Sequence, residues 1–157
     1  MNQMKNKEKV DIPVRKAKKE KINKPRRKTK TSYAKLKKAC DTAWSKFIHA
    51  RDKVCKKCGG STWLTAHHLI GRANLVLRWD EDNGMLLCMH CHIQQAHRNP
   101  LFFVEWLTEF KGAEWVEKLK ARSQQLVKWS IQDLEDKIAD LKDKTADLKS
   151  KTEEIDE

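Results

Sequence analysis

Four cysteines bracket a pair of adjacent histidines in the middle of the chain, and this stretch limits most strongly what the chain can fold into. The cysteines form two C-x-x-C pairs, Cys55 with Cys58 and Cys88 with Cys91. Tetrahedral zinc takes four thiolates, and each pair can present two of them from one tight turn. Two independent redox pairs are the alternative, but neither pair lies in a thioredoxin-like βαβ pattern. We therefore expect one structural zinc ion that is bound by both pairs.

The histidines between and after these pairs need a different role, because four thiolates already complete the zinc site. Adjacent residues on a strand point to opposite faces, so His67 and His68 are not expected to ligate one ion together. One of them can bind a metal while its neighbour faces a substrate beside that metal. His92 follows the second cysteine pair and can supply a further ligand from across a hairpin. A functional metal site, separate from the zinc site, is the expectation.

The residues around these motifs predict a short strand, a long loop, a second strand and a helix. Residues 62–68 are rich in β-formers and end at the histidine pair, and residues 69–82 form an unusually long excursion. A loop of that length inside a small domain is usually functional. Asn83-Gly84 is a turn signal, residues 85–87 form the second strand, and a helix that carries His92 begins after them.

Helices are expected on both sides of this centre. Ala43, Trp44, Phe47 and Ile48 recur at helical spacing, which predicts a helix over about residues 33–52 with its apolar side chains in the core. Asn99-Pro100 opens a helix over residues 101–110, and another is expected over residues 113–128 with Leu126 turned inward.

The C-terminal segment carries a heptad pattern. Ser130 and Asp133 form a capping pair, and apolar residues or threonines then fill alternating a and d sites through residues 131–155. We expect a coiled-coil-like helix that binds a second copy or another protein partner. The alternative is a single charged helix whose apolar seam folds back on the domain.

The positive charge is concentrated in the N-terminal segment. Residues 1–38 carry 16 Lys or Arg and 3 acidic residues, so the rest of a chain with net charge +12 is close to neutral. Apolar residues are few there, and we expect a disordered tail that contacts DNA, with a solubilising extension as the alternative. The expected contacts in this tail are Lys16, Lys18, Lys19, Arg26, Arg27 and Lys28.

The compartment follows from what the sequence lacks. We find no apolar leader and no apolar run of membrane-spanning length, so we expect a cytoplasmic protein with no membrane partner. In a reducing compartment metal ligation is favoured over disulfides, and Cys40, which lies outside both pairs, is expected to be a free thiol.

The motif AHH, then Asn83, then C-x-x-C-H resembles the HNH (ββα-metal) endonucleases, in the subgroup stapled by four cysteines. The lead-in TAWSKFIHARDKVCKKCG resembles phage recombination nucleases of the NinG type, and AHRNPLFFVEWL resembles small phage HNH proteins. The resemblance covers about residues 44–107. It implies an α+β fold with a small ββα-metal core, and one catalytic divalent cation (Mg²⁺, Mn²⁺, Ni²⁺ or Zn²⁺) distinct from the structural zinc.

The resemblance also implies roles for individual residues. His67 matches the first metal ligand, His68 the general base, Asn83 the residue that pins the long loop and orients the base, and His92 the second metal ligand. Related sequences often place another histidine four residues after the His92 position, where this chain has alanine and His97 follows. On a regular helix that shift rotates the side chain by about 100°, so His97 is expected only as an additional ligand.

The function expected on these grounds is that of a phage-encoded, metal-dependent DNA endonuclease in recombination, processing or packaging. The expected organisation is a basic tail (1–38), a nuclease domain with flanking helices (39–129) and the heptad helix (130–157). Arg72 and Arg78, in the long loop, are expected to hold the DNA backbone, with ordinary solvated surface as the alternative. The competing functions are a zinc module that binds nucleic acid without cutting it and a phage assembly adaptor.

Overall fold

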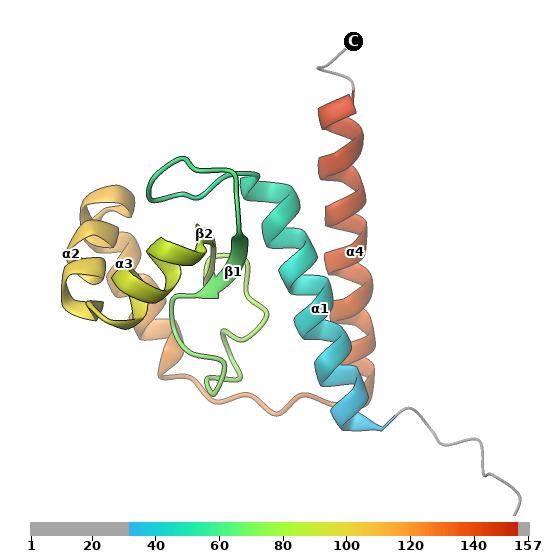
Figure 1. The fold of residues 1–157 in the computed structure, drawn as a ribbon. Helices are drawn as coiled ribbons and strands as arrows, with labels where there is room; N and C mark the ends of the chain where they lie inside the picture. The colour runs from blue at the N-terminus through green and yellow to red at the C-terminus, as the bar shows by residue number, and fades with distance from the viewer. Residues whose placement is uncertain (1–31, 154–157) are drawn as a thin grey trace, which may run out of the picture. The chain divides into compact units, whose positions relative to one another are not determined.

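The computed structural model describes residues 32–153, and the elements within them are arranged as in Figure 1. The tail residues expected to bind DNA, from Lys16 to Lys28, lie outside this range. The described elements, in chain order, are α1 (Tyr33–Asp52), β1 (Leu64–His68), β2 (Gly84–Cys88), the π-helix η1 (Cys91–His97), α2 (Pro100–Lys111), α3 (Ala113–Ser123) and α4 (Ile131–Glu153). The expected mixture of helices with a small sheet is confirmed; the identity of the centre as a ββα-metal core stays a prediction.

The sheet consists of β1 and β2, which pair antiparallel with Leu64 opposite Cys88 and His68 opposite Gly84. The first strand begins at Leu64 rather than at residue 62, because Trp63 has a φ of 52° and so interrupts the extended backbone. Gly84 lies directly against α1: a Cβ atom there would overlap Ile48 and lie 2.6 Å from Cζ2 of Trp44. Glycine at this position therefore lets the second strand lie close to the helix.

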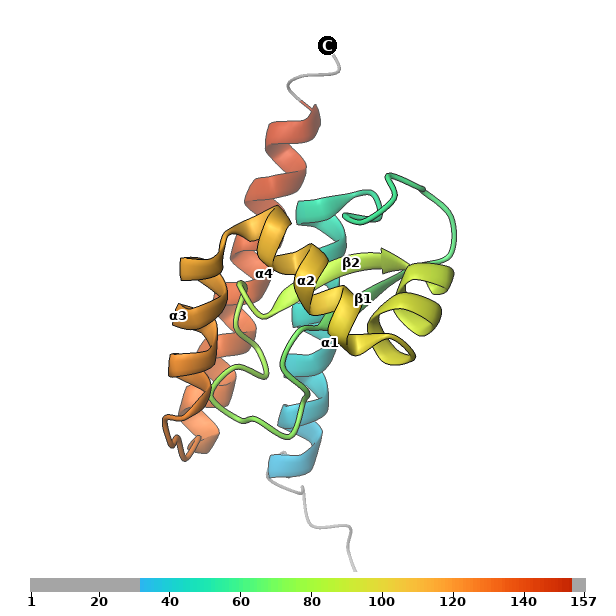
Figure 2. The ribbon, with the colours of Figure 1, turned by 90° about the vertical axis from the view of Figure 1, so that its left-hand side faces the viewer.

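Alternate side chains of β2 enter two different apolar clusters. Leu86 joins α1 and Trp79 in one cluster, whereas Met85 and Leu87 join α2 and α3 in the other. Figure 2 shows the same division, with α2 and α3 on one side of the sheet and α1 and α4 on the other. The two-residue period of a strand thus places the sheet, with its histidines, between two helical layers.

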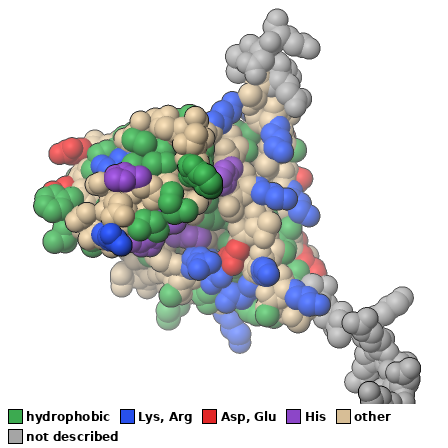
Figure 3. Space-filling view, viewed as in Figure 1, with side chains coloured by type: hydrophobic (Ala, Val, Ile, Leu, Met, Phe, Trp, Pro, Cys, Tyr) green, Lys and Arg blue, Asp and Glu red, His purple; other side chains and the backbone are tan. Residues whose placement is uncertain are grey.

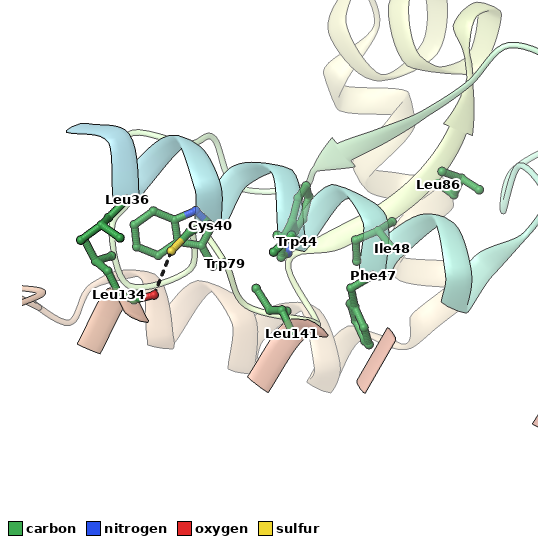
Figure 4. Packing of buried hydrophobic residues seen from close by; sticks show 10 residues of the cluster. Leu36, Cys40, Trp44, Phe47, Ile48, Trp79, Leu86, Leu134 and Leu141 are labelled. Atoms are coloured by element: carbon green, nitrogen blue, oxygen red, sulfur yellow. Dashed lines mark hydrogen bonds between the residues drawn. The ribbon is translucent and has the colours of Figure 1, made fainter. Parts of the chain in front are cut away.

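The helix α4 packs along α1 within the same chain. Leu134 and Leu141, both completely buried, contact the α1 cluster shown in Figure 4. The Cys40 thiol donates to the Leu134 carbonyl at 3.4 Å, and Lys53 donates to the Thr152 hydroxyl at 3.0 Å, so the two helices run parallel. The apolar seam of the heptads is therefore covered by α1, as the alternative interpretation had it. Self-association through residues 131–155 stays a prediction.

The division into a tail (1–38), a nuclease domain (39–129) and a heptad helix (130–157) stays a prediction. Residue 38 lies inside α1, and α4 belongs to the same compact unit as α1 and the sheet. None of the helices within residues 32–153 is both long and apolar enough to cross a membrane.

The expected helix over residues 113–128 ends five residues early, at Ser123. The Ser123 hydroxyl donates to the Lys120 carbonyl at 2.6 Å, and the Asn74 side chain donates to the Ser123 carbonyl at 2.7 Å. These bonds engage two of the carbonyls that would accept amides in another helical turn. Leu126, which was expected to face the core, is fully exposed.

Candidate metal centres and active-site pocket

The four cysteines come together at one end of the hairpin. Their sulfur atoms all lie within 4.8 Å of one another, and the sulfurs of Cys58 and Cys88 are 3.7 Å apart. Thiolates bound tetrahedrally to zinc at about 2.3 Å are separated by roughly 3.8 Å, so this spacing fits a single ion. The structure therefore brings together the four residues that the sequence assigned to structural zinc.

The backbone prepares the first cysteine pair for metal binding. Gly59, with a φ of 75°, closes a tight turn in which its amide donates to the Cys55 carbonyl at 2.8 Å. Burial raises the pKa of the Cys55 thiol, but hydrogen bonds from the backbone at Cys88, Cys58 and Lys57 outweigh this effect and lower the pKa to about 7. A thiol of this kind readily loses its proton to water, and the thiolate that remains is the form that binds a metal.

Three histidines form a second cluster on the η1 side of the sheet. The ligand atoms of His67, His92 and His97 all lie within 4.8 Å of one another. The Nε2 atoms of His92 and His97 are 3.0 Å apart. Two nitrogens that bind one ion at about 2.1 Å and at a right angle would be separated by about 3.0 Å. The three imidazoles could therefore hold a metal ion.

His97 joins this cluster because η1 is a π-helix. The Arg98 amide donates to the carbonyl of Ile93, five residues earlier, at 3.1 Å. A turn with this bond holds roughly one residue more than an α-helical turn. The fifth residue after His92 consequently takes the place that the fourth would have on an α-helix. A regular helix would rotate His97 away from His92, whereas the π-helix brings the two imidazoles together; the role of His97 as an additional ligand stays a prediction.

His67 is 7% exposed, and its ring contacts His92 and His97 edge-on at centroid distances of 4.8 and 5.3 Å. Burial, together with the two neighbouring imidazoles, lowers the pKa of His67 to about 3. Burial likewise lowers the pKa of His92. Both rings are therefore neutral near pH 7, which is the form that binds metal.

Thr65 sets the orientation of His92. Its hydroxyl donates to the Leu87 carbonyl at 3.3 Å and lies 2.7 Å from Nδ1 of His92. Because the single hydroxyl hydrogen goes to Leu87, the oxygen accepts from the His92 Nδ1–H group. The Nε2 atom of His92 then keeps its lone pair on the side of His97.

His68 lies on the opposite side of β1, as the alternation of the strand predicts. Its ring stacks on Trp44 with centroids 3.8 Å apart and an interplanar angle of 18°. Its Nε2 atom is 2.9 Å from the Arg78 carbonyl oxygen. A carbonyl only accepts, so Nε2 carries the proton and Nδ1 bears the lone pair. Burial lowers the pKa of His68, although the Arg78 carbonyl partly opposes this, and the ring is neutral near pH 7.

Asn83 holds the long loop in the shape that His68 needs. This completely buried side chain accepts from the Ile70 amide at 2.6 Å and donates to the carbonyls of Ile70 and Leu77 at 2.8 and 2.9 Å. Leu77 precedes Arg78, whose carbonyl accepts from His68. The side-chain amide of Asn83 thus joins the start of the loop, at Ile70, to Leu77, which is adjacent to the carbonyl that orients the His68 ring.

The two loop arginines have different environments. The Arg78 guanidinium donates to both carboxylate oxygens of Asp41, at 2.8 and 2.7 Å, and to the Arg72 carbonyl at 3.1 Å. These contacts fix the guanidinium within the protein, and its contact with a DNA backbone stays a prediction. Arg72 is exposed and lines a pocket of about 450 Å³ that also contains His67, His68, His92 and His97, which we call the histidine pocket.

A model of the family described as the bacteriophage lambda NinG protein matches residues 1–153. The chain belongs to the NinG family. No curated protein and no solved structure gives a significant match. The cysteine cluster, the histidine pocket and all of α4 therefore lie within the part that this NinG-family chain shares with its family.

Thr65 and Trp44 contact site histidines in this NinG-family protein but were not identified from sequence as site residues. Thr65 precedes His67 by two residues and so shares its face of the strand, a signal that the two-residue period could have given. Trp44 was identified only as a core residue. Its stacking on His68 depends on how α1 packs against the sheet, for which the sequence carries no local signal.

Proposed function

We propose that this NinG-family protein is a metal-dependent DNA endonuclease of the HNH (ββα-metal) type that acts in phage DNA recombination or processing. One observation carries the proposal. A three-imidazole cluster and a fourth, separately oriented imidazole line one pocket. Hydrolysis of a phosphodiester needs a cation beside the phosphate and a base that takes a proton from water.

His67, His92 and His97 are the residues that would hold the cation. When bound, a divalent cation would neutralise the negative charge that develops on the scissile phosphate and its leaving oxygen. The neutral state of His67 and His92 suits this role, because protonated rings could not act as ligands. The Cys55, Cys58, Cys88 and Cys91 cluster would hold the structural zinc that joins the turn before β1 to the end of β2.

His68 is the general base in this proposal. Its Nδ1 atom accepts a proton from the attacking water, and the resulting imidazolium is stabilised by its Nε2–H bond to the Arg78 carbonyl. Asn83 is a positioning residue, since it holds the loop segment that carries this carbonyl. Arg72, which is exposed in the same pocket, is suited to contact the substrate phosphate.

A non-catalytic nucleic-acid-binding module is the second candidate, and the charge of residues 1–38 favours it. Binding alone, however, gives no reason for His68 to be held neutral with its Nδ1 lone pair free. An assembly role through α4 has less support, because the apolar seam of that helix is covered by α1.

The test is a cleavage assay on supercoiled plasmid, linear duplex, branched DNA and single strands, with Mg²⁺, Mn²⁺, Ni²⁺ or Zn²⁺ added in turn. We expect nicked or linear products from at least one substrate, and only with an added divalent ion. Zinc-loaded protein without a further ion is the matched control. Absence of cleavage in every combination, with DNA binding retained, would favour the binding module.

Thr65→Val is expected to weaken binding of a divalent ion to the histidine cluster by roughly 10- to 100-fold, the usual effect of losing the partner of a metal-binding imidazole. Valine keeps the shape of threonine but cannot accept the His92 Nδ1–H bond. Titration of zinc-loaded protein with Ni²⁺ in a calorimeter measures the change. Thr108→Val, which removes an α2 hydroxyl that donates to the Val104 carbonyl, is the control. Equal Ni²⁺ affinity in both variants would show that Thr65 does not position His92.

A further inference from the structure

A second hollow lies beside the histidine pocket, between α1 and α4, and we call it the α1–α4 groove. Its volume is about 910 Å³. Asp41, Ser45 and Arg72 line both hollows, so one continues into the other. The far wall of the groove is made by Thr145 and Lys149 of α4. A chain that leaves the histidine pocket on this side would therefore pass over α1 towards α4.

The groove is lined by cations that pair with no acidic residue in the described range 32–153. Lys38 and Lys46 on α1, Lys149 on α4 and Arg72 in the loop all line it, and none of them forms an ion pair with another residue in the range 32–153. The one carboxylate that lines the groove, Asp41, is bound by Arg78. Figure 3 shows Lys and Arg side chains gathered over α1 and α4, next to histidine side chains.

Most of the side chains that line the groove are polar or charged. Ala50 is the only apolar residue among those that line the groove, whereas protein interfaces usually have an apolar core. Lys38 and Lys46 are two helical turns apart, a separation of about 12 Å along the axis of α1. At about 3.4 Å per nucleotide, that distance corresponds to three or four nucleotides of one DNA strand.

We infer that the α1–α4 groove binds the phosphate backbone of the DNA substrate on one side of the scissile phosphate. This inference rests on the proposed endonuclease function and deepens it. Lys38, Lys46 and Lys149 contact phosphates, and Arg72 stands where the groove meets the histidine pocket. The packing of Leu134 and Leu141 on α1 keeps α4 in place as the far wall. The heptad pattern then has a role within one chain, which is to hold a basic helix beside the pocket.

The experiment compares two triple variants of the zinc-loaded full chain, each of which loses three positive charges. The groove variant is Lys38→Gln, Lys46→Gln and Lys149→Gln, and the control is Lys118→Gln, Lys120→Gln and Lys128→Gln on and after α3. All six lysines are exposed, so folding should be retained, and thermal unfolding checks this. Binding of a fluorescent DNA duplex is followed by anisotropy over a range of salt concentrations, in a His68→Ala background so that the DNA is not cut.

The groove variant is expected to bind roughly tenfold more weakly or worse, and to reduce the slope of log affinity against log salt by about 2 to 3, close to 0.9 for each lost phosphate contact. The control should change both quantities much less. Equal losses in the two variants would overturn the groove, because only total charge would then matter, and unchanged binding in both would overturn it as well. Plasmid cleavage by protein with His68 intact tests the endonuclease proposal separately. If the groove variant loses DNA binding but the protein with His68 intact cleaves no plasmid, the groove proposal stands and the endonuclease proposal is rejected.

Discussion

His68→Ala is expected to lower DNA cleavage by roughly 10²- to 10⁴-fold, the usual contribution of a general base. The substitution removes the Nδ1 lone pair that would accept the proton of water. It leaves His67, His92 and His97 in place, since these lie on the other face of β1. Cleavage should therefore be lost while the affinity for the divalent ion stays near that of the wild type.

Initial rates of plasmid nicking, together with a metal titration, measure both effects. His90→Ala is the matched control, because the His90 side chain is exposed and caps no backbone group. Loss of the stacking on Trp44 could also lower stability, so His68→Gln, which keeps a planar side chain, is measured in parallel together with its unfolding temperature. If His68→Ala cleaves at the wild-type rate, His68 is not the base.

Cys55→Ser is expected to abolish zinc binding and to unfold the part of the domain around the hairpin. Structural zinc contributes apparent binding free energies of about 10–16 kcal/mol in zinc-finger peptides, more than the total stability of most small domains. Cys55 is 1% exposed and packs with Met85, Leu87 and Cys91 in the α2–α3 cluster. The adjacent Lys56 amide donates to the Leu86 carbonyl at 2.9 Å, so loss of the ion would also release the first turn from β2.

Zinc analysis of the purified protein and circular dichroism on heating test this expectation. Cys40→Ser is the control, because Cys40 is also buried but packs in the cluster between α1 and α4, which contains none of the other four cysteines. It should retain one zinc per chain and unfold cooperatively. Wild-type protein free of zinc, or a Cys55→Ser variant that keeps its zinc, would contradict the assignment.

Features that depend on neighbours in the sequence were predicted well. The helix over residues 33–52 has the bounds of α1, and the Asn99-Pro100 signal places the start of α2. The two C-x-x-C pairs meet as their spacing predicts, and His67 and His68 face opposite sides because a strand alternates. Each of these follows from local backbone geometry, for which the residue spacing is sufficient.

Features that depend on segments distant in sequence were decided only by the tertiary structure. The Arg78 guanidinium is bound by Asp41 of α1, a partner that the sequence did not indicate, and contact of Arg78 with DNA stays a prediction. The heptad seam predicts a partner helix without specifying which one. That partner is α1 of the same chain, because the segment between α3 and α4 brings α4 back to the side of the sheet where α1 lies.

The histidine cluster shows the same division within one site. The sequence by itself determined the residue types, the cysteine pairs and the opposite orientations of His67 and His68. Whether His97 joins His92 could not be read from a five-residue spacing, since an α-helix would separate the two rings and a π-helix brings them together. The bond from the Arg98 amide to the Ile93 carbonyl shows that this segment is a π-helix, which brings three imidazoles together rather than two.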